Sequence, residues 1–295
     1  MLSPLLLAAA RSRRVRSLVT GFPLSRGVVD RFVAGEDLGG AVAAVRELAG
    51  DGLAVTLDHL GEDTLDRAQA ERTRDAYLEL FAALEGWDAE ASVKLSALGL
   101  AVDRGLVLEN ARSVCEAAEL AGMTVTVDME DHTTVDATLE VVRQLRVDFP
   151  WVGVAIQAML RRSEGDLREL AGSRVRLVKG AYAEPESVAY GSRREIDRAY
   201  VRALRLLMRG DGYPMVATHD PRMIEIALEL ARGREPGSYE FQMLYGIRAA
   251  EQRRLVGAGE RVRVYVPYGA DWYGYFMRRL AERPANLVFF LRSFV

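Results

Sequence analysis

The residues best suited to chemistry stand on one predicted helix near the C-terminus. Four polar side chains recur there at i, i+3, i+4 and i+7, and so share one helix face: Tyr275, Arg278, Arg279 and Glu282. Two adjacent guanidinium groups beside a phenol could hold a small carboxylate, because arginine presents a planar set of donors that stays charged. The alternative is a solvated face on which Glu282 pairs with the arginines, since exposed ion pairs are common and weak.

The sequence around this helix sets its limits. A strand-like run over 262–266 is ended by Pro267 and Gly269. Asp271 then suits the N-cap position of the helix, and Pro284 ends it. The two arginines therefore follow directly from a predicted strand.

Eight short runs along the chain are typical of strands: 53–58, 92–97, 123–128, 152–157, 175–180, 214–219, 239–244 and 262–266. Most intervals between them show helical periodicity, for example 64–84, 106–121, 133–147, 196–208 and 223–231. Alternating strands and helices indicate a parallel sheet, and eight such units favour a closed (β/α)₈ barrel of the TIM type. No G-x-G-x-x-G follows the first strand, which argues against a Rossmann fold. We expect a helical extension over residues 1–50 and the barrel over 51–295.

Polar residues gather where these predicted strands end: Asp58, Lys94, Asp128, Gln157, Arg176 with Lys179, Thr218-His219-Asp220, Glu240 with Gln242, and Tyr265. Barrel enzymes place their chemistry at the carboxyl ends of the strands. An interior filled only for packing would show Val, Ile and Leu at such positions. So many charged groups together would be costly to bury unless they were bound to something.

Single members of this set allow other interpretations. Lys94 alternates with apolar neighbours, so it points either into the barrel, where it needs an anion, or into solvent. A barrel lysine can also form a Schiff base, which makes an aldolase using Lys94 or Lys179 a rival function. His219, taken alone, is more often a hydrogen-bonded structural group than a base or metal ligand.

Composition narrows the function classes. The chain has 295 residues and a net charge of −3, so no overall basic field suggests a nucleic-acid partner. Its one cysteine, Cys115, lies in an apolar helical pattern, and its three histidines are too scattered to predict a zinc or other metal site. An apolar run over 2–10 precedes arginines, the reverse of a secretory signal, and is too short to span a bilayer. We expect a cytoplasmic protein whose N-terminal end could touch a membrane surface.

The sequence blocks at these strand ends resemble those of flavin-dependent proline dehydrogenases. The matching blocks occur in that family's order from about residue 50 to the C-terminus: V-K94-L-S-A-L, D128-M-E, I-Q157-A, R176-L-V-K-G-A-Y182, A-T218-H219-D220, Y-E240-F-Q242-M-L244-Y-G and the run from Tyr265 to Asn286. R-L-V-K-G-A-Y and the paired-arginine helix are the most specific.

The resemblance implies a distorted barrel that holds FAD non-covalently, with the last helix over the barrel top. It implies that Arg278, Arg279 and Lys94 clamp the carboxylate of L-proline. Tyr275 and Leu244, with Tyr265 above, would pack the pyrrolidine ring against the flavin, and Asp128 would hold nearby groups by hydrogen bonds. Glu62 would form an ion-pair gate with Arg278.

The resemblance also implies a set of cofactor contacts. Arg176 would contact the flavin near its reactive nitrogen, and Gln157 would contact the isoalloxazine ring. Arg193 would meet the adenosine-phosphate end. The remaining cofactor-lining residues would be Lys179, Gly180, Ala181, Thr218, His219, Gln242, Glu282 and Phe289.

The expected reaction is hydride transfer from proline to FAD, giving 1-pyrroline-5-carboxylate. The resemblance implies a membrane quinone as electron acceptor, and hence transient contact with the bilayer. The chain lacks the nucleic-acid-binding and aldehyde dehydrogenase domains of large bifunctional relatives, so a separate pyrroline-5-carboxylate dehydrogenase should consume the product. The bulk of Tyr275 should crowd a 4-hydroxyl group and disfavour hydroxyproline, the substrate of an alternative dehydrogenase.

Overall fold

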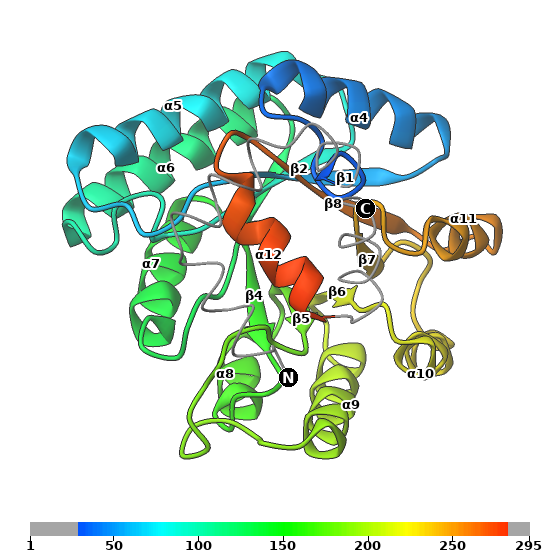
Figure 1. Ribbon diagram of the computed structural model, residues 1–295. Helices are drawn as coiled ribbons and strands as arrows, with labels where there is room; N and C mark the ends of the chain where they lie inside the picture. Colours follow the sequence, from blue (N-terminus) through cyan, green and yellow to red (C-terminus); the bar gives the residue numbers. More distant parts are fainter. Residues whose placement is uncertain (1–28, 283–295) are drawn as a thin grey trace, which may run out of the picture.

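The chain folds into a closed barrel of eight parallel strands surrounded by helices (Figure 1). In this computed structural model each strand pairs with the next, and β8 pairs with β1 to close the ring. Residues 29–282 are described, with the backbone alone for 278–282. The N-terminal run over 2–16, Pro284, Asn286 and Phe289 lie outside this range. The predicted (β/α)₈ class is confirmed.

The strands are β1 (Ala54–His59), β2 (Ala89–Val93), β3 (Thr124–Val127), β4 (Gly153–Gln157), β5 (Arg174–Val178), β6 (Tyr213–Ala217), β7 (Glu240–Leu244) and β8 (Val262–Tyr268). The helices are α4 (Leu38–Gly50), α5 (Arg67–Ala83), α6 (Arg104–Leu120), α7 (Val135–Asp148), α8 (Ser163–Glu169), α9 (Arg193–Arg209), α10 (Pro221–Ala231), α11 (Ala249–Gly257) and α12 (Trp272–Glu282).

One strand prediction was displaced. The run over 92–97 was expected to be extended, but β2 ends at Val93 and the chain then turns, with Ala97 N–H donating to the Lys94 carbonyl at 3.1 Å. Ala89 and Ala91, which do form the strand, carry little β-propensity and gave no signal. The shift places Lys94 directly after the strand, at its carboxyl end.

Short polar residues start several of the helices as the sequence suggests. Asp66 accepts a hydrogen bond from Gln69 N–H at 2.8 Å before α5, and Asp103 accepts one from Leu106 N–H at 2.9 Å before α6. Ser192 and Glu195 form a capping box at the start of α9. These caps satisfy amide donors that the first helical turn leaves open, so each loop ends at a defined residue.

The strands alternate between an apolar outer face and a polar inner face. Outward residues such as Leu57, Val125, Leu177 and Phe241 are buried against the helices in one continuous core. Inward residues include Thr56, Asp58, Glu90, Ser92, Thr126, Arg176, Gln242 and Arg263, all at most 4% exposed. Because side chains alternate with period two, β1, β2, β5, β7 and β8 direct charged side chains into the barrel. The interior is therefore an ion-pair network rather than the aliphatic layers usual in such barrels.

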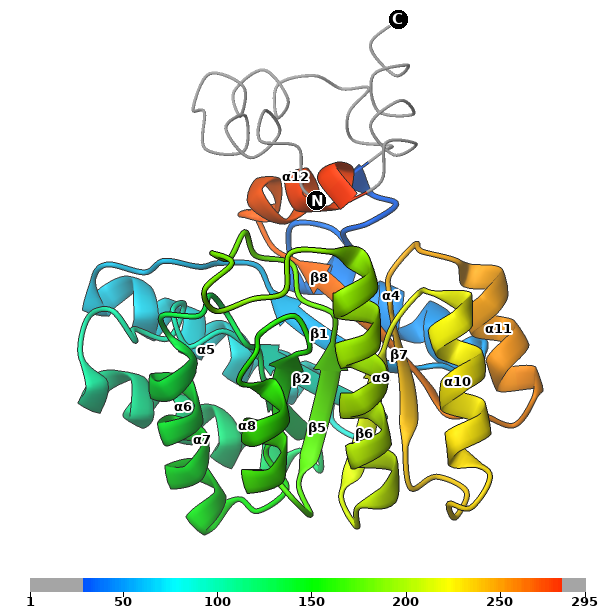
Figure 2. The ribbon, with the colours of Figure 1, turned by 90° about the horizontal axis from the view of Figure 1, so that it is seen from below.

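The last described helix, α12, lies across the carboxyl ends of the strands (Figures 1 and 2). A second apolar cluster joins it to the segment 29–33 and includes Phe32, Tyr275 and Phe276. Ala34 N–H donates to the Pro267 carbonyl at 2.8 Å, so the segment before α4 is fixed beneath α12. The division of the chain at residue 50 stays a prediction. Within residues 29–282, no helix is both long and apolar enough to cross a membrane.

Candidate active site

Lys94 and two aspartates meet at the covered end of the barrel. The Lys94 ammonium contacts both carboxylate oxygens of Asp58 at 2.8 Å and lies 3.8 Å from Asp128 Oδ2. Burial acts to lower the pKa of Lys94, but Asp58 and Asp128 outweigh burial and raise it. Lys94 is therefore inward and charged, and its anion in this structure is Asp58.

Arg176, on β5, is held by four acceptors from β2, β7 and the residue after β3. Its Nε donates to Gln242 Oε1 at 2.6 Å, its Nη1 to Ser92 Oγ at 2.5 Å and Asp128 Oδ1 at 2.6 Å, and its Nη2 to Glu90 Oε1 at 2.8 Å. The Tyr265 ring lies 5.4 Å from Arg176 Cζ, and the Tyr265 hydroxyl donates to Asp128 Oδ2 at 2.8 Å. Asp128 thus contacts Arg176, Tyr265 and Lys94.

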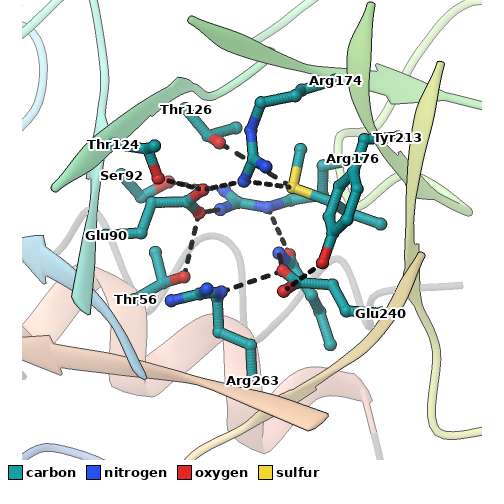
Figure 3. A network of polar contacts seen from close by, with 12 residues as sticks. Thr56, Glu90, Ser92, Thr124, Thr126, Arg174, Arg176, Tyr213, Glu240 and Arg263 are labelled. Atoms are coloured by element: carbon teal, nitrogen blue, oxygen red, sulfur yellow. Dashed lines mark hydrogen bonds and ion pairs between the residues drawn. The ribbon is translucent and has the colours of Figure 1, made fainter. Parts of the chain in front are cut away.

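A second, lower layer of charges lies near the amino-terminal ends of the strands, and Figure 3 shows it around Arg176. Glu90 accepts from Arg174 Nη2 at 3.1 Å as well as from Arg176. Glu240 accepts from Arg263 Nε at 2.9 Å and from Gln242 Nε2 at 2.7 Å. Both carboxylate side chains are 0% exposed, so removing their arginine partners would leave a buried charge without compensation.

The charges of this ion-pair network balance. Four carboxylates face four cations: Asp58, Glu90, Asp128 and Glu240 against Lys94, Arg174, Arg176 and Arg263. Arg261 and Asp88, which contact Glu240 and Arg263 at the edge of the network, add one charge of each sign. This neutral assembly has no surplus charge to attract an anionic substrate. Any net attraction for a carboxylate at this end must come from outside the network, and α12 carries Arg278 and Arg279 over it.

The pKa of Glu90 predicts how stability falls in acid. Burial acts to raise this pKa, but Arg176, Arg263 and Arg174 outweigh burial and lower it from 4.5 to about 2. Its stabilisation is complete above about pH 4.5 and is lost as pH falls towards 2. We expect urea midpoints to decline across this window in the wild type, and to decline less in Glu90→Gln. Equal declines in the two proteins would contradict this assignment.

Gln157, at the end of β4, has a hydrogen-bond partner for its side-chain nitrogen but none for its side-chain oxygen among the described residues. Its Nε2 donates to the Glu130 carbonyl at 2.6 Å, which fixes the amide orientation, while its buried Oε1 meets no donor among the described residues. Glu130 itself accepts from Ser96 N–H at 3.0 Å and Ser96 Oγ at 2.5 Å. A buried acceptor of this kind suits a ligand that carries an N–H group.

The remaining predicted cofactor residues lie along the β5, β6 and β7 ends. Lys179 Nζ contacts Asp197 Oδ1 at 2.5 Å and Asp220 Oδ2 at 3.0 Å. His219 Nε2 accepts from Leu244 N–H at 2.9 Å, so this ring nitrogen carries no proton. Thr218 is buried, and its Oγ1 accepts from Asp220 N–H at 3.1 Å.

Other predicted residues fall at the margins of this region or outside it. Gly180 has φ +111°, which an L side chain rarely adopts, and Ala181 follows it half-buried in the loop. Arg193 is exposed at the start of α9. Glu62, in the loop after β1, is close enough to contribute to the raised pKa of Lys94, though less than Asp58 and Asp128 do. The side chains of Arg278, Arg279 and Glu282, and all of Phe289, lie outside the described structure.

Comparison with known proteins decides the family. The family described as "Proline dehydrogenase" matches residues 41–292. The chain belongs to the proline dehydrogenase family. It is 38% identical over 271 residues to Proline dehydrogenase 2 of Bacillus subtilis (strain 168), covering 90% of this chain and 89% of that one. It is 42% identical over 277 residues to Proline dehydrogenase of Deinococcus radiodurans, with the same two coverages.

A solved family structure has the same fold. Proline utilization A from Bdellovibrio bacteriovorus, inactivated by N-propargylglycine, superimposes with a TM-score of 0.80 at 27% identity. The match covers 87% of this chain and 32% of that chain. The family and fold predictions are thereby confirmed.

Family membership and geometry together disfavour the aldolase alternative. A Schiff-base nucleophile must be a neutral amine, whereas the pKa of Lys94 is raised. Lys179 is paired with two carboxylates at hydrogen-bonding distance. Neither lysine is prepared to attack a carbonyl.

The sequence analysis gave no role to several residues that contact Lys94 or Arg176 or belong to the charge network around them. Asp58 was noted at a strand end, but its bidentate contact with Lys94 was not foreseen. Glu90, Ser92 and Arg263 were not singled out, although they alternate with apolar residues along β2 and β8. That alternation, read with barrel closure, is the signal that could have found them.

Proposed function

We propose that this protein oxidises L-proline to 1-pyrroline-5-carboxylate, with FAD as the hydride acceptor. The observation that carries the proposal is the position of α12. The helix that bears Arg278 and Arg279 covers the barrel end where Lys94, Asp128 and Arg176 gather (Figure 2). Family membership supplies the reaction type, and this arrangement supplies a place for a small carboxylate.

The residues at the barrel end fit a flavin. The isoalloxazine ring carries one N–H and several acceptors, and Gln157 Oε1 is a buried acceptor that meets no donor among residues 29–277. Arg176 has five N–H groups and uses four of them on described residues, so the fifth could meet an acceptor of the ring. FAD would supply the hydride acceptor, and the protein would supply orientation and electrostatics.

The chain's own residues would bind and orient the substrate. Arg278, Arg279 and Lys94 would hold the carboxylate, so that the ring carbon next to nitrogen faces the cofactor. Buried Tyr275, with Leu244 and Tyr265, would pack the ring and exclude water. Such positioning can lower a barrier by several kcal/mol, roughly 7 to 11 at the extreme. Water, aided by the cationic clamp, would take the proton of the substrate amine.

Further cofactor contacts are proposed along the same barrel end, from Lys179, Gly180, Ala181, Thr218, His219, Gln242, Arg193, Glu282 and Phe289. Glu62 would close the site by pairing with Arg278. Glu62→Ala should then alter the dependence of the reaction rate on proline concentration. An unchanged dependence would contradict the proposed ion-pair gate.

The electrons would pass to a membrane quinone, with the protein in the cytoplasm and in transient contact with the bilayer. A separate pyrroline-5-carboxylate dehydrogenase would consume the product. Proline-dependent reduction of a soluble quinone analogue would support the acceptor, whereas reduction of artificial dyes alone would argue against it.

The reaction is tested by product analysis. Purified protein with added FAD, L-proline and an electron-accepting dye should form a product two mass units lighter than proline, at the rate of dye reduction. The same product from D-proline at an equal rate, or no product, would contradict the proposal.

Tyr275 should set selectivity against hydroxyproline. It is 6% exposed in the apolar cluster under α12, so a 4-hydroxyl group would meet its ring. We expect kcat/KM for L-proline to exceed that for 4-hydroxyproline by on the order of 100-fold, and Tyr275→Ala to narrow the ratio. Tyr273→Ala, at an equally buried position of the cluster, is the control. Equal efficiencies in the wild type would favour a hydroxyproline dehydrogenase.

A further inference from the structure

Glu90 points into the interior of the barrel beside Arg176 (Figure 3). It contacts Nη2 of Arg176, whereas Asp128 contacts Nη1. It belongs to the lower charge layer and lies below the groups proposed to meet proline. Its side chain is 0% exposed. A carboxylate in that position cannot exchange partners with solvent, so its contacts are fixed by the barrel.

The carboxylate of Glu90 is itself held from four directions. Thr56 Oγ1 donates to its Oε1 at 3.0 Å, Thr124 Oγ1 to its Oε2 at 3.3 Å, and Arg174 Nη2 to its Oε2 at 3.1 Å. The fourth donor is Arg176 Nη2 at 2.8 Å. The position of the Glu90 carboxylate is thus fixed by these four contacts, and it meets Arg176 from the amino-terminal side of the barrel.

The partners of Arg176 divide into two charged and two neutral groups. Asp128 holds Nη1 from the substrate end and Glu90 holds Nη2 from the interior, while Ser92 and Gln242 are uncharged. The side chain of Asp128 is 16% exposed and also accepts a hydrogen bond from the Tyr265 hydroxyl. Glu90 is therefore the partner that fixes the plane of the guanidinium independently of the substrate end.

We propose that Glu90 is a positioning residue of the reaction. It orients the one N–H of Arg176 left for the cofactor, and it offsets part of the positive charge that Arg176 presents there. This inference rests on the proposed function, because it places the flavin against Arg176.

Two effects of opposite sign follow for Glu90→Gln. Removing the negative charge leaves more positive charge beside the cofactor, which should raise the flavin midpoint potential. Loosening the guanidinium should misalign it, and a displacement of about 1 Å can slow a reaction by about 100-fold. A higher potential with slower reduction by proline is a combination that simple loosening of the fold would not produce.

Glu90→Asp separates charge from position. It keeps the negative charge but is one methylene too short to keep the 2.8 Å contact with Arg176. It should slow reduction with little change in potential. Glu240→Gln is the matched control, since Glu240 is equally buried and bound to Arg261, Arg263, Tyr213 and Gln242.

The measurements are flavin midpoint potential and the rate constant for anaerobic reduction by proline, on holoenzyme with flavin content and folding checked by absorbance and circular dichroism. We expect Glu90→Gln to raise the potential and slow reduction by about 100-fold, with Glu240→Gln near wild type. Glu90→Gln matching Glu240→Gln in both would overturn the inference. If Glu90→Gln binds no flavin, the test rests on Glu90→Asp. A wild-type rate constant for flavin reduction by proline in Glu90→Asp would then overturn the inference. Wild-type protein that proline fails to reduce would instead overturn the proposed function.

Discussion

Replacing Arg176 by lysine is expected to lower kcat/KM for L-proline by roughly 100- to 1,000-fold, the loss typical of removing one preorganised donor. The planar guanidinium of Arg176 donates to four acceptors on β2, on β7 and just after β3. The ammonium group of a lysine is a point charge with three donors and cannot reproduce this arrangement. Lysine would leave Glu90 or Asp128 without its partner and would misplace the donor meant for the cofactor. The loss should appear in kcat as well as in KM.

Steady-state kinetics with a dye acceptor measures this effect. The control is Arg143→Lys, because Arg143 has a 55% exposed side chain and pairs only with its helix neighbour Glu140 in the described structure. The control should behave like wild type. Kinetic constants for Arg176→Lys within a few-fold of wild type would contradict the assigned role of Arg176.

Loss of either arginine on α12 is expected to act mainly on substrate binding. The interior network is electrically balanced, and the charge of Lys94 is already met by Asp58 at 2.8 Å. We propose that Arg278 and Arg279 supply the surplus positive charge for the substrate carboxylate. A hydrogen bond to a charged group contributes about 1.5 to 3 kcal/mol, so Arg278→Met and Arg279→Met should each lower kcat/KM by roughly 10- to 100-fold, largely through KM.

Proline titrations of both variants check this expectation, with Arg143→Met as the control. A competitive carboxylate inhibitor should weaken in parallel, whereas a neutral amide analogue of proline should not. An unchanged KM and unchanged carboxylate inhibition would show that the clamp lies elsewhere.

The barrel could be predicted because its signals are local. Most strands carry a short β-like run, and helices such as α5, α6 and α9 show helical periodicity in the sequence. Where local signals fail, the prediction shifts. The alanines of β2 gave no strand signal, so the expected strand slid to the residues around Lys94.

The charge network could not be predicted in the same way, because it depends on pairings across the barrel. Glu90 and Arg176 are 86 residues apart, and an alternating charged strand reads equally well as one that faces solvent. The charged face of the strand becomes an interior surface only because the sheet closes into a barrel. The resemblance to a family gave roles to Lys94 and Arg176, but not the partners that hold them, Asp58 and Glu90.

The network also explains why this interior is both stable and specific. Buried ion pairs add little to stability over an apolar core, but breaking one by removing a partner costs about 3 to 5 kcal/mol. The pair of Glu90 with Arg176 therefore holds β2 and β5 in one arrangement. That arrangement fixes Arg176 at the covered end of the barrel.

The visible spectrum of the purified protein, recorded before and after anaerobic addition of L-proline, tests the central claim most directly. We expect a flavin spectrum, with FAD added if needed, that bleaches with L-proline and stays unchanged with D-proline. A flavin that L-proline does not bleach would contradict proline oxidation, and a protein that takes up no flavin would contradict the proposed cofactor site.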